Sequence, residues 1–241
     1  LTHESDVDPG LATRLNLKLG ARPLLAYRRT LDDLSEGQKL TAEVVGNPVR
    51  DALLNGRRNE GRRLAGLADD DVRPLLLVLG GSQGAREIND LVGGCLDRLL
   101  KKCAVVHQTG PGNPAQSDRS GYMTRPFFRE ELPHLLAAAD LAVARSGAGS
   151  VWELAATCTP AVYVPLRGAS RGDQLLNASV AEERGVSVTL EPGADPERLA
   201  SIVLELLSDS DRLENMKRSA TAYAASTAAD RIVTILMEYL K

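Results

Sequence analysis

The feature that most constrains the fold of this 241-residue chain is a repeating pattern between Arg73 and Glu191. Short aliphatic runs alternate with longer stretches that carry apolar residues at helical spacing. This alternation predicts an α/β fold, a parallel sheet with helices on both faces, because parallel strands need a crossover to return the chain. The expected strands are 73–81, 103–110, 140–147, 160–165 and 186–191, and the expected helices are 85–102, 129–139, 148–158 and 172–185.

The segments on either side of this core differ from it. Ahead of the core, residues 12–21 and 49–63 have helical spacing, whereas 22–27 and 40–50 have the composition of strands. Behind it, residues 195–241 carry three helical patterns and no strand pattern. With 241 residues, the chain is long enough for one large domain or two small ones.

Composition argues against several classes of function. A formal net charge of −3 and an aromatic content of 3% disfavour nucleic-acid binding, which relies on basic patches or stacking rings. Cys95, Cys103 and Cys158 are too few and too widely spaced for a disulfide framework or a metal site, and we expect all three to be buried thiols. No apolar run reaches the roughly 20 residues of a membrane-spanning helix.

Glycine-rich and polar strings lie where expected strands end. They are GGSQG at 80–84, RSGAGS at 145–150 and GDQ at 172–174. Open parallel sheets bind ligands beyond the carboxyl ends of their strands. The second string also opens a helix, whose first backbone amides have no partner inside the helix and favour a phosphate.

Two interpretations of Glu153 stay open. Its carboxylate would be repelled by a phosphate at the helix start unless it accepted hydrogen bonds from ribose hydroxyls. Alternatively, Ser150 and Glu153 form a capping box, because they are three residues apart. The string GGSQGA lacks the G-x-G-x-x-G fingerprint, which disfavours an NAD-binding domain, and it can also be a plain strand-to-helix connection.

Several strings occur together in an order and spacing that resemble the MurG family of glycosyltransferases, a branch of family 28. They are GGSQGAREIN, HQTGPG, ADLAVARSGAGSVWELAA, PAVYVPL and DQLLNA, preceded by HESDVDPGLATRLNLKLGAR and GNPVR. The resemblance covers nearly the whole chain. It implies a GT-B fold, in which two Rossmann-like domains face each other across a cleft. It also implies four parts of the chain: the end of an acceptor domain (1–45), a connection (46–72), a UDP-sugar-binding domain (73–210) and C-terminal helices that pack back toward the first domain (211–241).

The resemblance also implies an activity, the inverting transfer of N-acetylglucosamine (GlcNAc) from UDP-GlcNAc to a lipid-linked muramoyl-pentapeptide. Asp173 departs from the family pattern, in which His or Gln often stands before the glutamine, and a helix N-cap role suits it. The implied donor contacts are Ser82 and Arg50 for the diphosphate, Ala148, Gly149 and Ser150 for the α-phosphate side, Glu153 for the ribose, Phe128 and Arg129 for the uracil edge, and Gln174 and Asn177 for the GlcNAc hydroxyls.

The acceptor half of the implied site is only partly represented in this sequence. The family's glycine-rich loop with a histidine is absent from these 241 residues, so the catalytic candidates are His3, Glu4 and Asp6. The alternative is that HESD is only a structural turn. We therefore expect this chain alone to bind UDP-GlcNAc weakly and to transfer little of it.

The partners implied by the resemblance are UDP-GlcNAc, the undecaprenyl-linked muramoyl-pentapeptide and the membrane, with a peripheral position on the cytoplasmic side of the bacterial inner membrane. We expect no cofactor, no metal and no nucleic acid. Two other functions stay open. The chain could be a non-catalytic nucleotide-sugar-binding subunit that needs a separate acceptor domain, or a related glycosyltransferase that transfers from a UDP-sugar to diacylglycerol.

Overall fold

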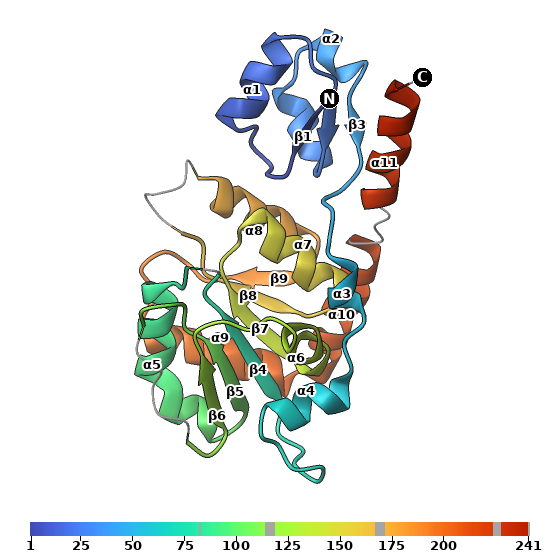
Figure 1. Cartoon of the computed structure of the whole chain (residues 1–241). Coiled ribbons are helices and arrows are strands. Elements are labelled where there is room, and N and C mark those ends of the chain that lie inside the picture. The colour runs from blue at the N-terminus through green and yellow to red at the C-terminus, as the bar shows by residue number, and fades with distance from the viewer. Residues whose placement is uncertain (82, 114–118, 167–171, 224–227, 241) are drawn as a thin grey trace.

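The larger part of the molecule is built on a six-stranded parallel sheet (Figure 1). The computed structural model describes residues 1–81, 83–113, 119–166, 172–223 and 228–240. The expected parallel α/β fold is confirmed, and each expected aliphatic run contains a strand. In spatial order the strands are β6 (Tyr122–Arg125), β5 (Ala104–Gln108), β4 (Leu75–Leu79), β7 (Leu141–Ala144), β8 (Ala161–Tyr163) and β9 (Ser187–Thr189).

Strand β6 forms in a segment for which the sequence pattern predicted no element, ahead of the helix expected at 129–139. Its four residues include only two apolar side chains, Tyr122 and Met123, so no aliphatic run marks it. The strand lies at the edge of the sheet, in parallel register with Val105 to Gln108 of β5. Backbone pairing along the free side of β5 therefore specifies this strand, and hydrophobic patterning contributes little.

Side chains of β4 alternate between two hydrophobic clusters, one on each face of the sheet. Leu76 and Val78 pack with helices α5 (Arg86–Leu100) and α9 (Pro196–Ser208). Leu75 and Leu77 pack on the opposite face, with helices α6, α7 and α8. These three helices are α6 (Leu132–Ala138), α7 (Ala148–Ala156) and α8 (Asp173–Glu183).

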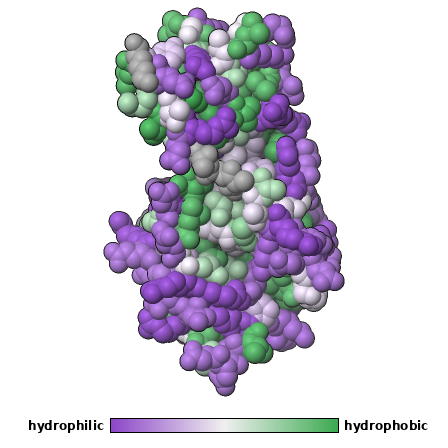
Figure 2. Space-filling view, turned by 90° about the vertical axis from the view of Figure 1, so that its right-hand side faces the viewer, coloured by the Kyte–Doolittle hydropathy of each residue, from purple (hydrophilic) through white to green (hydrophobic). Residues whose placement is uncertain are grey.

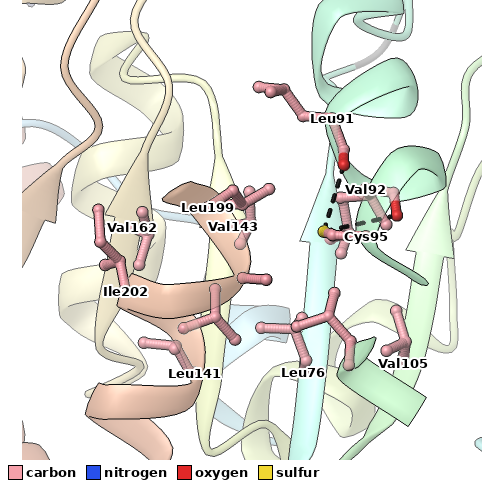
Figure 3. Packing of buried hydrophobic residues seen from close by; sticks show 14 of the residues in the cluster. Leu76, Leu91, Val92, Cys95, Val105, Leu141, Val143, Val162, Leu199 and Ile202 are labelled. Carbon is pink, nitrogen blue, oxygen red and sulfur yellow. Dashed lines mark hydrogen bonds between the residues drawn. The ribbon is translucent and has the colours of Figure 1, made fainter. Parts of the chain in front are cut away.

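Two of the three cysteines are buried, as expected. Cys95 lies inside the first cluster, where its Sγ is 3.2 Å from the carbonyl oxygen of Leu91 (Figure 3). Burial raises the pKa of the Cys95 thiol to about 11 and that of Cys103 to about 12, so both stay protonated at neutral pH. The expectation for Cys158 is wrong, because this residue is only partly buried, beyond the end of α7.

A smaller parallel sheet of three strands forms a second unit at the N-terminal end (Figure 1). Its first strand was not expected, because the segment Thr2–Glu4 has no apolar side chain; it forms by pairing with the buried second strand. The elements of this unit are β1 (Thr2–Glu4), α1 (Leu11–Lys18), β2 (Pro23–Leu25), the 3-10 helix η1 (Arg28–Asp33), α2 (Glu36–Lys39) and β3 (Glu43–Val44).

The last helix, α11 (Ala228–Tyr239), returns to this smaller unit (Figure 1). Ile235 clusters with Leu24 and Val45, and the Arg231 guanidinium donates to the carbonyl oxygen of Val44 at 2.9 Å. The preceding helix α10 (Ser210–Tyr223) packs instead against α7 and α9. Across the described part of the chain, no helix combines the length and the hydrophobicity that crossing a bilayer requires.

Aromatic rings pack where the two units meet. Tyr27 of the smaller unit lies edge-on to Trp152 of α7, with ring centroids 5.5 Å apart. Trp152 in turn packs against Tyr223 at the end of α10, with centroids 5.0 Å apart. Figure 2, which shows the right-hand side of the view in Figure 1, has hydrophilic residues over much of the larger unit. The rings thus join segments that are far apart in sequence.

The segment between the units was expected to be one helix but forms two short ones, α3 (Asp51–Leu54) and α4 (Arg58–Leu64). Both approach α6 closely. A side chain at Gly56 would place its Cβ 2.0 Å from the carbonyl oxygen of Pro133, and a Cβ at Gly61 would lie 1.9 Å from that of His134. The chain therefore bends around α6 and contacts it through glycines.

We expect the substitution Gly61→Ala to lower the free energy of unfolding by about 1–3 kcal/mol, because the added methyl group forces α4 away from α6. The matched control is Gly37→Ala in α2, where nothing lies within 4 Å of the added Cβ. There alanine is expected to be neutral or stabilising by up to about 1 kcal/mol. Urea unfolding of both variants checks this, and equal stabilities would contradict the close packing of α4 on α6.

Candidate functional site

The strand order of the larger sheet reverses between β4 and β7. Chain order runs from β4 outward to β6 in one direction, and then from β7 outward to β9 in the other. The connections after the adjacent strands β4 and β7 consequently leave toward opposite faces of the sheet. Such a reversal is the place where doubly wound α/β proteins bind their ligands. The described residues of the string 80–84 follow β4 and those of 145–150 follow β7, so both segments begin at this switch point, which we call the crevice.

The start of α7 presents backbone amides to this crevice. Gly147 is the N-cap and has an extended backbone (φ −64°, ψ 147°), the helix begins at Ala148, and no side chain caps it. The first amides of an uncapped helix carry partial positive charge and can bind an anion. The alternative of a Ser150–Glu153 capping box is wrong, because Ser150 is already the third residue of the helix.

Glu153 forms an ion pair with Arg50 of the connection between the units. Glu153 Oε1 lies 3.0 Å from Nη2 and 3.2 Å from Nε of Arg50. The Arg50 side chain is 65% exposed and that of Glu153 is 29% exposed. The two residues expected to serve different parts of a nucleotide thus contact each other here. A pair this exposed contributes only about 0–1 kcal/mol, so it can exchange partners at little cost.

The turn after β4 needs its glycines. Gly81 and Gly84 have φ of 79° and 78°, a region that glycine adopts readily. A Cβ at Gly84 would also lie 2.5 Å from the carbonyl oxygen of Thr109, so the turn packs directly on the loop after β5. Ser82, the expected diphosphate contact in this turn, lies outside the described residues.

Helix α8 begins beside the start of α7. Ser146 Oγ donates to the carbonyl oxygen of Gln174 at 2.7 Å, and Gln174 Oε1 accepts from the backbone amide of Leu166 at 2.9 Å. The expected N-cap role of Asp173 is wrong: Gly172, with φ of 94°, is the N-cap, and Asp173 is the first residue of the helix. Gln174 is half-buried, and its contact with Ser146 places it beside the string 145–150.

Asn177 contacts the smaller unit and is fully buried. Its Oδ1 accepts from the backbone amide of Val7 at 3.1 Å, and its Nδ2 donates to Asp6 Oδ1 at 2.7 Å and to the carbonyl oxygen of Ser146 at 3.2 Å. The amide expected to bind a sugar is therefore engaged, in this conformation, in joining the two units. We call this set of contacts the Asn177 clasp.

The three catalytic candidates also make structural contacts. Glu4 is 5% exposed and accepts from the backbone amides of Asp6 at 3.1 Å and Gly10 at 2.7 Å. His3 Nε2 lies 3.0 Å from the carbonyl oxygen of Gly46. Asp6 belongs to the Asn177 clasp. These contacts fit the alternative of a structural segment, and proton transfer by His3, Glu4 or Asp6 stays a prediction.

The segment expected to read uracil follows β6. The Phe128 amide donates to Gln108 Oε1 at 3.0 Å, and the Arg129 amide donates to Glu131 Oε2 at 3.1 Å. The Phe128 side chain is buried, whereas the Arg129 guanidinium lies over the Phe127 ring, 5.7 Å from its centroid. Because both amides are engaged, these two residues could contact a ligand through the backbone only with their carbonyl oxygens, and that of Arg129 already accepts from the Leu132 amide at 3.4 Å.

Sequence reasoning missed several polar residues that fasten the loops of the site. Arg145 Nη1 lies 2.7 Å from Glu87 Oε2 and 2.9 Å from the carbonyl oxygen of Val164, which ties the end of β7 to α5 and to β8. His107 and Gln108, at the end of β5, are buried and hydrogen-bonded. Their position at the ends of buried strands could have identified them in the sequence, because polar side chains there need hydrogen-bond partners.

His107 is held in one tautomer by its neighbours. Asn89 Nδ2 donates to the carbonyl oxygen of Thr109, which leaves Asn89 Oδ1 to accept from His107 Nε2 at 3.0 Å. His107 Nδ1 then accepts from the Tyr122 hydroxyl at 3.0 Å. Burial lowers the pKa of His107 to about 4, so the ring is neutral above that pH. Within the described ranges, no group of three or more His, Cys, Asp or Glu side chains is arranged to hold a metal ion.

Fold and site together define a doubly wound α/β protein that presents glycine turns and an uncapped helix start for an anionic ligand. Residues 75–232 match the Glycosyltransferase family 28 C-terminal domain, and the chain belongs to this family. The resemblance inferred from the sequence strings is thereby confirmed.

Two curated relatives are both named UDP-N-acetylglucosamine–N-acetylmuramyl-(pentapeptide) pyrophosphoryl-undecaprenol N-acetylglucosamine transferase. The protein from Treponema denticola is 34% identical over 100% of this chain and 65% of its own length. The protein from Clostridium kluyveri is 35% identical over 99% of this chain and 67% of its own length. The chain thus spans about two-thirds of these relatives.

The crystal structure of MurG from Acinetobacter baumannii superposes with a TM-score of 0.70 at 24% identity, covering 98% of this chain and 65% of that one. At this identity the likeness shows the fold, and it confirms the expected GT-B architecture with a Rossmann-like sheet.

We expect Asn177→Ala to lower the free energy of unfolding by about 1–3 kcal/mol, because it leaves the Asp6 carboxylate and the Val7 amide without their partner. Urea unfolding measures the loss, and hydrogen exchange should show a faster-exchanging Val7 amide. The control is Asn215→Ala, an exposed asparagine on α10, for which little change is expected. An unaltered Val7 exchange rate would contradict the clasp.

Stability should depend on the ionisation of His107. Its pKa is about 4 in the folded protein and about 6.5 in the unfolded chain, so the unfolded chain takes up the proton first on acidification. The contribution of neutral His107 is complete above about pH 6.5 and is lost as the pH falls toward 4, by up to about 3 kcal/mol. Urea unfolding of wild type and His107→Gln at several pH values checks this, and parallel pH profiles would contradict it.

Proposed function

We propose that this chain binds UDP-GlcNAc at the carboxyl edge of its six-stranded sheet. We further propose that it is the donor-binding part of a MurG transferase, which moves GlcNAc with inversion to the lipid-linked muramoyl-pentapeptide. The observation that carries the proposal is the uncapped start of α7 beside the glycine turn at 80–84, with Glu153 on the same helix. The names of the curated relatives, which describe this transfer, support the choice of substrates.

The diphosphate is proposed to lie between the turn after β4 and the start of α7. Ala148, Gly149 and Ser150 supply backbone amides, the macrodipole of α7 adds partial positive charge, and the Ser82 hydroxyl adds a donor. As the bond to GlcNAc breaks, negative charge grows on the departing UDP. Fixed donors aimed at that charge lower the barrier without reorganising.

The Arg50–Glu153 pair is proposed to exchange partners when the donor binds. Glu153 would accept hydrogen bonds from the two ribose hydroxyls, and Arg50 would turn to the diphosphate. Both residues gain from this exchange, because a carboxylate accepts readily from hydroxyls and a guanidinium matches phosphate oxygens. The exposure of the pair keeps the cost of breaking it low.

Base and sugar are proposed to lie on opposite sides of the diphosphate. Carbonyl oxygens near Phe128 and Arg129 suit the N3–H donor of uracil, whereas cytosine presents an acceptor at that atom. Gln174 would hold GlcNAc hydroxyls from the start of α8. Asn177 could join it only by leaving the clasp with Asp6, which would couple sugar binding to the arrangement of the two units.

The acceptor is proposed to approach from the side of the smaller unit, where His3, Glu4 and Asp6 lie. Because this acceptor is lipid-linked, the whole protein would work peripherally on the cytoplasmic face of the membrane. The chain spans about two-thirds of its relatives, so lipid II formation is best assayed both with this chain and with a full-length relative.

The test of the proposal is nucleotide binding by the 241-residue chain, measured by calorimetry with UDP and 2′-deoxy-UDP. Wild type should prefer UDP, and Glu153→Gln should weaken UDP binding about tenfold or more, because a hydrogen bond to a charged acceptor contributes about 1.5–3 kcal/mol. The same variant should bind the two ligands almost equally well. The control is Glu183→Gln, which removes an exposed ion pair with Arg29 at the far end of α8.

Three outcomes separate the possibilities. A wild-type chain that binds no UDP would refute the proposed function. UDP binding with the same preference in Glu153→Gln would refute only the ribose role of Glu153. An equal loss in Glu183→Gln would attribute the effect to general charge, again removing the specific role.

A further inference from the structure

Gln108 joins two loops of the site that are not neighbours in the sheet. It is the last residue of β5 and is 4% exposed. Its Nε2 donates to the carbonyl oxygen of Gly81 at 3.1 Å, and its Oε1 accepts from the Phe128 amide at 3.0 Å. Gly81 follows β4 and Phe128 follows β6. Strand β5 lies between these two strands, and Gln108 at its end contacts the loops on both sides.

We propose that Gln108 is a positioning residue, which fixes the diphosphate turn and the uracil-reading segment relative to each other. This inference rests on the proposed function, because it assigns a ligand to both loops. The two atoms that Gln108 binds are backbone atoms, and each proposed loop would contact the ligand through its backbone. The Gly81 carbonyl oxygen belongs to the turn proposed to bind the diphosphate. The Phe128 amide belongs to the segment proposed to read uracil, so its hydrogen bond fixes the backbone just ahead of Arg129.

The chemistry of the side chain fits this bridge. A glutamine amide carries one acceptor and two donors, so it can bind a carbonyl oxygen and an N–H group at the same time. Glutamate would lack the donor and leucine would lack both. In a buried position each group left unpaired costs about 1–3 kcal/mol, which gives the bridge one stable geometry.

Other contacts hold the loop in between, and they make the bridge rigid. The Thr109 amide donates to the carbonyl oxygen of Arg125, and the Gly110 amide donates to that of Pro126, both at 3.0 Å. Gly84 packs against Thr109 without room for a side chain. The loops after β4, β5 and β6 therefore form one body, with Gln108 buried beneath it.

The first experiment measures hydrogen exchange of the ligand-free chain. Gln108→Leu should speed exchange of the Phe128 amide and of the amides around Gly81 together. Gln108→Glu should keep the Phe128 amide protected, because it retains the acceptor, and should loosen only the turn. Thr159→Val is the control. It also removes a buried hydroxyl, which donates to the carbonyl oxygen of Leu136. Thr159 precedes β8, which is separated from β5 by β4 and β7.

The second experiment compares UDP and CDP binding by calorimetry. Gln108→Leu is expected to weaken UDP binding about tenfold and to reduce the preference for UDP over CDP several-fold, whereas Thr159→Val should leave both within about twofold. Gln108→Glu should retain more of the base preference than Gln108→Leu, because the Phe128 amide keeps its partner. A general loss of stability would not lower the ratio of UDP affinity to CDP affinity progressively from wild type through Gln108→Glu to Gln108→Leu.

The outcomes distinguish the two levels of the proposal. Unchanged exchange at Phe128 and Gly81 in Gln108→Leu would overturn the bridge itself. Wild-type binding of UDP with an unaltered UDP-to-CDP ratio in a folded Gln108→Leu variant would overturn the positioning role alone. Absence of UDP binding by wild type would overturn the proposed function, and with it the assignment of ligands to the two loops.

Discussion

The hydrogen-bonded ladder between β4 and β7 is the constraint on which the rest of the structure depends. It pairs Leu79 with Ala144, and the ladder on the other side of β4 pairs Leu79 with Gln108. Three strands therefore end at one level, and their following loops begin side by side. Because right-handed crossovers send α5 and α7 to opposite faces, a crevice remains between the two connections. Among the described residues of the larger unit, the proposed donor contacts lie at this edge or on a helix that starts there.

The two units are joined by contacts of unequal strength. Asn177 is fully buried, so breaking the clasp leaves the buried Val7 amide without its partner and removes the hydrogen bond to Asp6 Oδ1. The Arg50–Glu153 pair is exposed and is easily replaced by a ligand. A donor that bound at the crevice would therefore displace the exposed pair first, while the clasp and the packing of Tyr27 on Trp152 kept the units together.

The parts of the fold that the sequence predicted are those in which hydrophobic burial decides the structure. Residues 75–79 and 86–100 carry clear strand and helix periodicities, because their apolar side chains face the core. Strands β1 and β6 escaped prediction, because pairing with a neighbouring strand forms them and three or four residues show no pattern. The break between α3 and α4 depends on the approach to α6, which is not visible locally.

For the site, local strings identified the loops but not the partners of their side chains. Nothing in the spacing of Ser150 and Glu153 distinguished a capping box from a free carboxylate; the structure excludes the box, because the helix begins two residues earlier than Ser150. Asn177 stands three residues after Gln174, a spacing that favours a shared helix face. Its actual partners, Asp6 and Val7, are about 170 residues away in sequence. Contacts of this separation follow from the packing of whole units, which no short motif encodes.

Buried polar side chains explain why the loops of the crevice can be precise without being hydrophobic. Loops carry few apolar side chains, so they cannot be fixed by core packing alone. At the ends of β5 and β7, His107, Gln108, Arg145 and Ser146 extend from rigid strands to backbone or side-chain atoms of neighbouring segments. Each would destabilise the core if it lost its partner, so each holds its neighbour in one place. The rigidity of the sheet is thereby transmitted to the loops that a nucleotide would contact.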